Sequence, residues 1–446
     1  MTRRTFLSAA GISALTATAQ TKRPNVVLIM TDQQSNLALT ANGNPYLKTP
    51  AMDSLVADGV SFIQSYATYP VCSPARANLM TGRMPHEAGV MQNGEAIVDG
   101  MPTMGEHFRA HGYKTYYAGK WHLPGGFGDP AGFDKLIGGE TLGANMDEPL
   151  SAACVEFLTK EPAEPFLLVA SFMNPHDVCH WIRGHEGSRD YDSTAQYPPA
   201  PGNLWRDPAE PEYIQHHRAA NYNLMSNSLH ISGEWKADDF RHYLYDYYRM
   251  VEQVDRQIAR VLSALRFRGL AEDTVIVFTS DHGEGMGGHR WTQKAAFWEE
   301  TARVPLIVSG KGVARRGIVD DRALVSGMDV LPTMCDYAGI PQPARVRGES
   351  LRPAIEGRGF EREFVVSELA HLGGDDRQGR MLRTSRFKYV AFNGGARPEQ
   401  LFDLQLDPGE VNNLAYKPEG KSELDRHRKL LRGWLTETKD DFRPAV

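Results

Sequence analysis

The sequence predicts an α/β fold in which helices flank a large doubly wound, mostly parallel sheet, with a smaller C-terminal α+β subdomain containing an antiparallel sheet. Four apolar runs that end in polar residues predict the large sheet, because continuous Val, Ile and Leu runs are typical of strands buried on both faces. They occupy 25–34, 165–177, 274–284 and 304–310, and segments of helix length separate them. Short extended segments after residue 340 predict the smaller subdomain.

One long amphipathic helix is predicted over residues 240–269. Its apolar residues recur at helical spacing, and Gly269 suits its end. These apolar residues are Met250, Val251, Val254, Ile258, Val261, Leu262 and Leu265. Residues 183–239 are rich in Pro, Asn, Asp, His and Tyr and show no periodicity, so we expect long loops there that face the substrate or pack on the surface.

The C-terminal part is expected to combine a hairpin with a final helix. Asn393, Gly394 and Gly395 form a turn signal between extended segments, and the stretch LDRHRKLLRGWL predicts a helix. The chain therefore divides into a leader over 1–19, a catalytic α/β domain over 20–340 and a C-terminal subdomain over 341–446.

The first twenty residues, MTRRTFLSAAGISALTATAQ, resemble a twin-arginine export signal. Arg3 and Arg4 precede a weakly apolar run, and Ala17, Thr18 and Ala19 provide a small-residue cleavage site. The run is too short and too polar to span a bilayer, so we expect an exported protein, periplasmic or extracellular, without a membrane anchor. The alternative is a frayed N-terminus in which the paired arginines occur by chance.

The composition is that of an ordinary globular protein. The chain has 446 residues, 41% hydrophobic and 23% charged, with a net charge of −6 from 49 basic and 55 acidic residues. This balance excludes a disordered chain and gives no reason to expect nucleic acid as a partner, since nucleic-acid binding needs a concentrated basic face. An anionic substrate would have to be bound by a local group of basic residues. The sequence does not predict an oligomeric state.

The four cysteines are too few and too widely spaced to form a disulfide scaffold. Cys154 and Cys335 are expected to be small buried apolar residues. If Cys72 is set aside, Cys179 and these two allow at most one disulfide bridge.

The stretch VCSPARANLMTGR places Cys72 where a helix is expected to begin. Ser73 suits the N-cap, Pro74 the first helical position and Gly82 the end, so Cys72 would lie at the positive end of the helix. Backbone N–H groups and Arg76 would together hold a tetrahedral oxyanion. A cysteine-dependent phosphatase loop needs its arginine six positions after the thiol, and here the gap is four.

Polar side chains follow several of the predicted strands. Asp32, His176 and Asp281 with His282 come directly after apolar runs, and ligands of doubly wound sheets bind at the carboxyl ends of strands. A further strand is predicted to end near Lys120. Because alternate residues of a strand share a face, Lys120 and His122 are expected to point the same way.

These residues resemble the sulfatase family of the alkaline phosphatase superfamily. Its Cys-x-Pro-x-Arg motif is matched by Cys72, Pro74 and Arg76, and the likeness spans roughly 24–416, with further motifs in GYKTYYAGKWH, TDQQ, SDHGE and LFDLQLDPGEVNNLA. The resemblance implies that a formylglycine-generating enzyme converts Cys72 to Cα-formylglycine. One hydroxyl of the hydrated aldehyde then attacks sulfur, and deprotonation of the other expels sulfate.

The resemblance also implies a divalent metal ion bound by Asp32, Gln33, Asp281 and His282. Such an ion lowers the pKa of the attacking hydroxyl and neutralises sulfate charge. Calcium is the implied metal, with magnesium or manganese as alternatives because a histidine nitrogen is softer than calcium's usual ligands. The family often has a second aspartate where this chain has Gln33, so this site is less anionic. The alternative is that Asp32 and Asp281 merely cap loops.

Four further residues receive catalytic roles from the resemblance. Lys120 holds the formylglycine oxygen and the sulfate, and His122 is the base that drives sulfate elimination. His176 and Lys294 contact the sulfate and the leaving oxygen, with His176 as general acid. The assignment of Lys294 depends on its spacing from Asp281, and a solvated surface charge is the alternative.

Substrate selectivity is expected to come from neighbouring loops. The candidate substrate-binding residues are Asn93, Cys179, His180, Trp181, Arg183 and His289. Trp181 would stack on a sugar or aromatic ring, and Arg183 would pair with a carboxylate or a second sulfate. Core packing of Trp181 and solvent exposure of Arg183 are equally open.

The predicted function is the hydrolysis of a sulfate monoester to sulfate and an alcohol. A carbohydrate sulfate, from a small molecule or an oligosaccharide, fits export and the aromatic loops. The alternatives are a phosphonate monoester or phosphodiester hydrolase on the same scaffold, and an inactive carbohydrate-binding relative with unmodified Cys72.

Overall fold

The structure is a computed structural model that describes residues 22–123, 129–139, 142–160, 162–184, 194–219, 231–370 and 376–445. The expected export signal over 1–19 lies outside these residues. No helix in the described part of the chain combines the length and apolarity that a membrane crossing requires.

An eight-stranded sheet forms the centre of the molecule, in the order β5-β4-β6-β1-β7-β8-β2-β9. Its strands are β1 (Asn25–Asp32), β2 (Gly59–Phe62), β4 (Lys114–Gly119), β5 (Asp134–Gly138), β6 (Phe166–Pro175), β7 (Thr274–Ser280), β8 (Leu306–Gly310) and β9 (Ile318–Asp320). Strands β5, β4, β6, β1 and β7 pair in parallel. The predicted mostly parallel sheet is confirmed.

Strand β8 corrects one part of that prediction. The run at 304–310 was expected to be parallel to the others, but β8 pairs antiparallel with both β7 and β2. A continuous apolar run indicates burial on both faces and carries no information on direction. The chain from 281 to 305 stays at the edge where β7 ends, because Asn36, just beyond β1, donates its backbone N–H to the carbonyl of Arg303. Strand β8 therefore returns from that edge.

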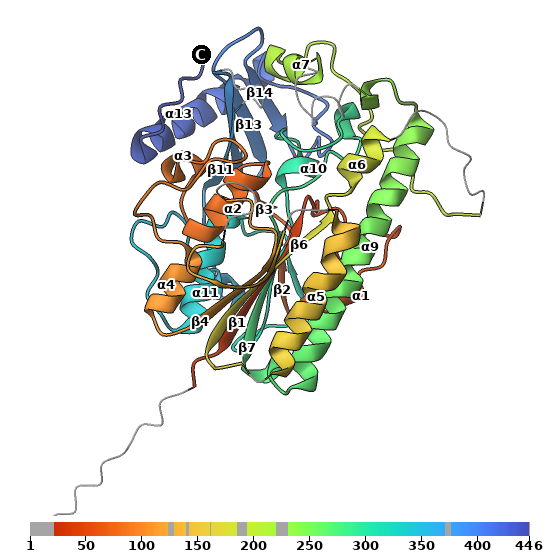
Figure 1. Cartoon of the computed structure of the whole chain (residues 1–446). Helices are drawn as coiled ribbons and strands as arrows, with labels where there is room; N and C mark the ends of the chain where they lie inside the picture. The colour runs from red at the N-terminus through yellow and green to blue at the C-terminus, as the bar shows by residue number, and fades with distance from the viewer. Residues whose placement is uncertain are drawn as a thin grey trace, which may run out of the picture.

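Helices cover both faces of the sheet (Figure 1). One face is covered by α1 (Pro50–Ala57), α5 (Gly143–Thr159) and α9 (Ala237–Phe267), and the other by α2 (Cys72–Thr81), α4 (Met104–Ala110) and α11 (Val330–Ala338). In β1, Val26 and Leu28 belong to the core on the α11 side, whereas Val27 and Ile29 belong to the core on the α9 side. This alternation explains why the strand is apolar throughout.

Helix α9 matches the predicted long helix. Its buried side chains include Val251, Ile258 and Leu265. The helix ends in a Schellman turn, in which Leu270 N–H donates to the carbonyl of Leu265 and Gly269 adopts a positive φ of 67°.

The loop prediction for 183–239 is only partly correct. Within it, α7 (Glu212–Ala219) is a helix whose Tyr213 and Ile214 are buried. Its apolar residues are too few to show periodicity, and they pack against the C-terminal part of the chain, where Tyr213 stacks on Phe392 with ring centroids 4.4 Å apart. A contact this distant in sequence leaves no local pattern.

A second, antiparallel sheet lies in the C-terminal part, as predicted. It consists of β11 (Phe364–Ala370), β12 (Gln378–Thr384), β13 (Phe387–Phe392) and β14 (Glu399–Asp403), followed by α13 (Lys421–Thr438). The predicted hairpin at 393–395 connects β13 to β14. Further short elements are β3 (Ser65–Tyr66), β10 (Val325–Ser326), α3 (Pro85–Ala88), α10 (Glu299–Ala302) and α12 (Arg352–Ile355).

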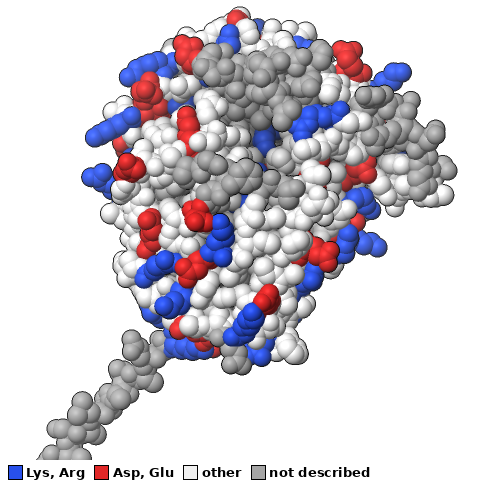
Figure 2. Space-filling model, in the orientation of Figure 1, with Lys and Arg blue, Asp and Glu red and all other residues white. Residues whose placement is uncertain are grey.

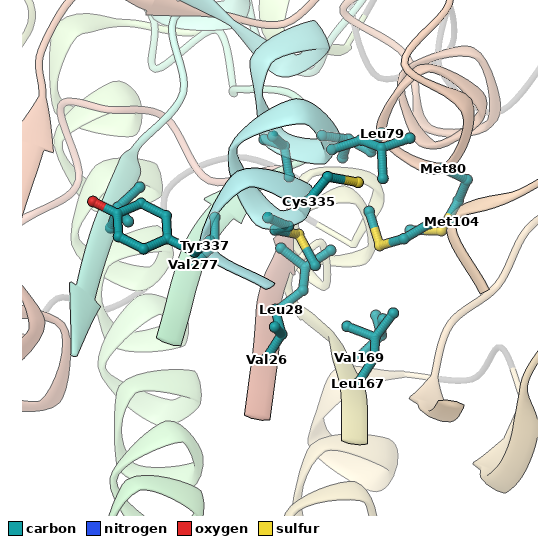
Figure 3. Close-up of a cluster of buried hydrophobic side chains, with 14 of the residues drawn as sticks. Val26, Leu28, Leu79, Met80, Met104, Leu167, Val169, Val277, Cys335 and Tyr337 are labelled. Carbon is teal, nitrogen blue, oxygen red and sulfur yellow. The ribbon is translucent and has the colours of Figure 1, made fainter. Parts of the chain in front are cut away.

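The core on the α11 side contains Cys335, which packs among Leu28, Leu79 and Val169 (Figure 3). Cys154 is buried in the opposite core. Both cysteines are small buried apolar residues, as predicted, and all four cysteines are free thiols.

The surface shows no concentration of one charge on the side displayed in Figure 2. Lys and Arg are interspersed there with Asp and Glu. On this face, charges of the two signs are therefore mixed and do not form a patch of one sign.

An ion pair between His86 and Glu368 ties α3 to the C-terminal sheet, and we expect its contribution to stability to depend on pH. The two side chains approach to 2.5 Å, and Asp440, itself held by Arg380, lies 4.0 Å from the His86 Nδ1 atom. Burial acts to lower the pKa of His86, but the Glu368 and Asp440 carboxylates raise it above its ordinary value. A raised histidine pKa stabilises the folded state fully below the unfolded pKa of about 6.5, and this stabilisation is lost as pH rises through the folded pKa.

The measurement is the free energy of unfolding of the wild type and of His86→Ala across pH 5.5 to 9. The difference between the two is expected to be larger at the acidic end and to shrink at the basic end. A difference that stays constant with pH would show that His86 acts by packing alone.

Candidate active site

Cys72 is the first residue of α2, which corrects the predicted start of that helix. The N-cap is Val71, in extended conformation with φ −151°, so Ser73 is the second helical residue. Ser73 instead donates its Oγ hydrogen bond to the His122 carbonyl at 2.7 Å, and its backbone N–H donates to Asn93 Oδ1 at 2.9 Å. Side chains and loops distant in sequence satisfy this helix start, so the N-cap residue itself need not be polar. Gly82 ends the helix with a φ of 66°, as predicted.

Four neighbouring strands bring the predicted polar residues to one edge of the sheet. Asp32 ends β1, Lys120 follows β4, His176 follows β6 and Asp281 follows β7. Because β4, β6, β1 and β7 are adjacent and parallel, their carboxyl ends meet at one place. The sheet topology therefore gathers residues that are far apart in sequence.

Arg76 lies beneath this edge, and its position corrects the expected role. Its guanidinium donates to Asp281 Oδ2 at 2.9 Å, to Asp32 Oδ2 at 3.0 Å, to the Lys120 carbonyl at 2.8 Å and to Ser171 Oγ at 2.9 Å. The side chain is 1% exposed. Since these acceptors engage the fork of the guanidinium, Arg76 holds two carboxylates in place instead of facing an oxyanion.

The Cys72 sulfur lies between cationic and anionic groups. Its Sγ atom is 3.0 Å from Lys294 Nζ, 3.1 Å from His282 Nε2 and 3.8 Å from Asp32 Oδ1. Burial and the Asp32 carboxylate act to raise the pKa of the thiol, but the charges of Lys294, Lys120 and His282 outweigh them and hold it well below its usual value. Its environment therefore favours an anion at this position.

The other three cysteines show the opposite behaviour. Burial raises the pKa of Cys154 and of Cys335 to about 12 each, and that of Cys179 to about 11. The electrostatic setting thus distinguishes Cys72 from every other thiol of the chain.

Two carboxylates and an imidazole beside Cys72 form a donor set that suits a divalent cation. Ligand atoms of Asp32, Cys72, Asp281 and His282 all lie within 4.8 Å of one another. The His282 Nδ1–H donates to the carbonyl of Gly283 at 2.8 Å, so Nε2 is the ring nitrogen that faces the cluster and could bind a cation once it has lost its proton. The residues present therefore fit the metal that the family resemblance implies, and hard oxygen ligands favour calcium, magnesium or manganese.

Gln33 extends this donor set on one side. Its backbone N–H donates to Asp281 Oδ1 at 3.1 Å, and its side-chain Oε1 accepts from Lys294 Nζ at 3.1 Å. The side-chain Nε2 donates to the buried carboxylate of Glu284. Gln33 has a φ of 70°, a strained conformation of the kind that is concentrated at functional sites.

Lys120 and His122 do not lie on the strand end that was predicted for them. Strand β4 ends at Gly119, whose φ of 102° and close packing against β6, where a Cβ would lie 2.0 Å from a backbone oxygen, require glycine. Lys120 then forms an ion pair with Asp32 at 2.9 Å. His122 has a φ of 56°, so the alternation argument fails for it, and its carbonyl is anchored to Ser73 at the start of α2.

His176 lies directly after β6 beside the cationic groups. Burial and the charge of Lys294 hold its pKa well below the usual value, against the opposite effect of Asp32. Its Nδ1 atom is buried and has no hydrogen-bond partner among the described residues. The ring is therefore neutral near pH 7 and has an unused polar atom.

Helix α6 (Val178–Arg183) carries four of the residues proposed for substrate selectivity, namely Cys179, His180, Trp181 and Arg183. His180 is exposed, and its Nδ1 atom lies 3.0 Å from an Arg183 nitrogen. Trp181 packs edge-on against Trp235 at 5.8 Å and next to Tyr243, so its ring is used in the core. The packing alternative for Trp181 is the one the structure shows.

His289 is separated from the predicted site and forms part of another cluster. It is 3% exposed, stacks on Trp298 at 3.7 Å and groups with Glu300 and Glu410. Burial and nearby cations lower its pKa to about 3. Proximity to Lys294 in sequence was the reason to predict it, but positive φ values at positions 289, 290, 293 and 295 turn the chain sharply between the two.

Sequence reasoning missed three residues that support the site. Glu284, Gln293 and Ser171 are fully or almost fully buried and hydrogen-bond to residues of the cluster or their immediate neighbours. A carboxylate two positions beyond His282 was the available signal for Glu284. Ser171 lies inside an apolar strand and gave no signal.

Three features occur together in this fold: a mostly parallel sheet, a helix that begins at Cys72, and a cluster of carboxylates and histidine at the strand ends. Together they define a hydrolase of the alkaline phosphatase superfamily. The chain belongs to the sulfatase family, because the family model described as Sulfatase matches residues 24–340. A model described as N-sulphoglucosamine sulphohydrolase, C-terminal, matches residues 287–436. The protein is therefore a sulfuric ester hydrolase, and the resemblance seen in the sequence is confirmed.

Known relatives match almost the whole chain. A Delta 4,5-hexuronate-2-O-sulfatase of Bacteroides thetaiotaomicron is 32% identical over 97% of this chain and 93% of its own length. A solved 2-O GAG sulfatase superposes with a TM-score of 0.85 at 30% identity, covering 95% of this chain and 94% of that chain. A phosphonate monoester hydrolase of Agrobacterium radiobacter, at 24% identity and a TM-score of 0.76 over 93% and 96% of the two chains, shares the fold.

Proposed function

We propose that the chain is a formylglycine-dependent sulfatase that hydrolyses a carbohydrate sulfate monoester to sulfate and the free alcohol. The setting of Cys72 carries the proposal, since its sulfur lies within 3.1 Å of both Lys294 Nζ and His282 Nε2 at the first residue of a helix. In the mature protein the sulfur position would be taken by an oxygen of the hydrated aldehyde.

A divalent cation bound by Asp32, Gln33, Asp281 and His282 would lower the pKa of a hydroxyl at position 72 and neutralise sulfate charge. The chain's own residues prepare the place for it. Arg76 fixes one oxygen of each carboxylate, so that Oδ1 of both aspartates lies 3.8 Å from His282 Nε2.

Two ammonium groups are placed to bind the sulfate. Lys120 lies 2.9 Å from Asp32, and Lys294 lies 3.0 Å from Cys72 Sγ. Because both are almost fully buried, their charges act through a medium of low dielectric constant and attract an anion strongly. We assign to them the binding of the sulfate oxygens.

Proton transfer is assigned to two histidines. His176 would donate to the bridging oxygen of the ester, and the negative charge of a bound sulfate ester would raise its lowered pKa toward the working range. His122, anchored through its carbonyl to Ser73 next to Cys72, would accept the proton that accompanies sulfate elimination.

A 2-O-sulfated uronic acid is the first substrate to test. The proposal is supported by the Bacteroides thetaiotaomicron relative, a Delta 4,5-hexuronate-2-O-sulfatase that matches 97% of this chain. Arg183, which lies on α6 beside the exposed His180, offers a cation for the carboxylate of such a sugar.

We also propose that the chain is exported with the twin-arginine leader and is converted by a formylglycine-generating enzyme beforehand. The paired Arg3 and Arg4 support the export route. Loss of periplasmic or extracellular activity in an Arg3→Lys, Arg4→Lys variant, with intracellular activity retained, is the expected result.

The experiment that tests the function compares three esters on the purified chain expressed with a maturation enzyme. We expect kcat/KM to be highest for a 2-O-sulfated unsaturated uronate, lower for an aryl sulfate and lowest for a phenyl phosphonate monoester. Faster phosphonate hydrolysis would instead assign the chain to that rival activity, and binding of the sulfated sugar without turnover would identify an inactive relative.

A further inference from the structure

Glu284 has a fully buried carboxylate that contacts hydrogen-bond donors of the site. Its Oε1 accepts from the Tyr243 hydroxyl and from the backbone N–H of Gln293, and its Oε2 accepts from Gln33 Nε2. No catalytic or metal-binding role was predicted for it from the sequence. Its contacts lead to Gln33, which lies next to Asp32.

The contacts of Gln33 allow only one orientation of its side-chain amide. The carboxylate of Glu284 can accept hydrogen bonds but not donate them, whereas the ammonium of Lys294 can donate but not accept. Gln33 therefore turns Nε2 to Glu284 and Oε1 to Lys294, which it meets at 3.1 Å. In the inverted orientation the amide N–H₂ would face the ammonium and the amide oxygen would face the carboxylate.

The backbone of Gln33 is held independently of this choice. Its N–H donates to Asp281 Oδ1 at 3.1 Å, and its carbonyl accepts from the Tyr247 hydroxyl at 2.9 Å. With the backbone fixed at a φ of 70°, the orientation of the amide depends on the contacts of the side chain itself.

We propose that Glu284 is a positioning residue, which holds the Gln33 amide with its oxygen turned to Lys294 and the cation pocket and so makes Gln33 usable as a cation ligand. The inference rests on the proposed function, because the cation is the one that the sulfatase reaction uses. An aspartate at position 33 presents an oxygen in either orientation, whereas glutamine has only one oxygen and needs an acceptor behind its nitrogen.

Glu284 also supplies the negative charge that a second aspartate would have contributed. Its carboxylate contacts the Gln33 side chain and does not itself occupy the ligand position. Support of this kind from behind a metal ligand is worth about 10- to 100-fold in metal affinity or activity.

The test is a cycle of variants built from Glu284→Gln and Gln33→Glu. In the wild-type background, the amide introduced at position 284 has to satisfy three donors, which it cannot do without turning its own N–H₂ toward one of them. When both changes are present, that amide can donate to the carboxylate introduced at position 33, while its oxygen still accepts from Tyr243 and Gln293. Glu284→Gln is thus expected to weaken cation binding when position 33 is glutamine, but not when it is glutamate.

The readout is calorimetric titration of Ca²⁺ into the metal-free full chain with unconverted Cys72, with Mg²⁺ and Mn²⁺ titrated in the same way. We expect Glu284→Gln alone to weaken cation affinity by about 10- to 100-fold, and to cause no loss in the Gln33→Glu background. Glu399→Gln is the matched control, because Glu399 is also buried and accepts from a tyrosine hydroxyl, Tyr389, but lies in β14.

Equal losses in both backgrounds, or no loss in either, would overturn the proposal, as would a wild-type chain that binds none of the three cations. Circular dichroism of each variant separates a weakened site from a failure to fold, and the double variant provides the decisive comparison if Glu284→Gln unfolds. Turnover is not measured here, so a chain that fails to hydrolyse sulfate esters would refute the proposed function and leave this result standing.

Discussion

Cys72→Ala is expected to lower kcat for sulfate ester hydrolysis by at least about 10⁴-fold, as removal of a catalytic nucleophile does. The side chain of residue 72 is the group on α2 that contacts both Lys294 and His282. Its removal therefore leaves no nucleophile at this position. The melting temperature is expected to stay within about 2 °C of the wild type, because the substitution removes only a small polar group from a polar site. Initial rates on a sulfated sugar and a thermal unfolding curve measure both effects.

Cys154→Ala is the matched control for this variant. Cys154 is equally buried but lies in the apolar core on the α9 side. We expect full turnover and a loss of about 1 kcal/mol in the free energy of unfolding from the cavity left behind. Retained turnover in Cys72→Ala, or a larger drop in melting temperature there than in Cys154→Ala, would indicate a structural thiol instead of a catalytic precursor.

Arg76→Ala is expected to lower the free energy of unfolding by about 3–5 kcal/mol in the presence of a chelator, because it removes the buried cation that pairs with Asp281 and leaves Asp32 paired with Lys120. Arg76 bridges Asp32 and Asp281, both of which are fully or almost fully buried. Excess Ca²⁺ is expected to recover part of this loss, since a bound cation neutralises the same two carboxylates. Denaturant unfolding with and without Ca²⁺ measures both quantities.

Arg380→Ala provides the comparison for Arg76→Ala. Arg380 is fully buried and forms a bidentate ion pair with Asp440, away from the cation pocket. Arg380→Ala is expected to lower the free energy of unfolding by a similar amount, and Ca²⁺ is not expected to recover this loss. Recovery by Ca²⁺ at both positions would show that the effect of the ion is not local to Asp32 and Asp281.

The strand ends could be predicted from the sequence because a buried parallel strand carries a continuous apolar run. Asp32 and Asp281 follow such runs, and the rule that ligands bind at carboxyl ends brings them together. The direction of β8 could not be predicted in this way, since burial on both faces produces the same run in either direction.

The contacts of individual side chains were harder to predict because they depend on residues far along the chain. Arg76 was expected to face a bound anion, yet the carboxylates of Asp32 and Asp281 lie closer and occupy its guanidinium. Trp181 is a residue type that could stack on a sugar, but its partly buried ring packs against Trp235 and Tyr243. Glu284 carries no motif of its own, and only the folded position of Gln33 shows its place in the site.

Mass spectrometry of the tryptic peptide over residues 49–76, taken from active protein expressed with a maturation enzyme, shows whether Cys72 is converted to formylglycine. We expect that the Cys72 side chain has changed from CH₂–SH to an aldehyde and no longer reacts with a thiol alkylating reagent. Fully active protein in which that peptide keeps an alkylatable thiol would contradict it.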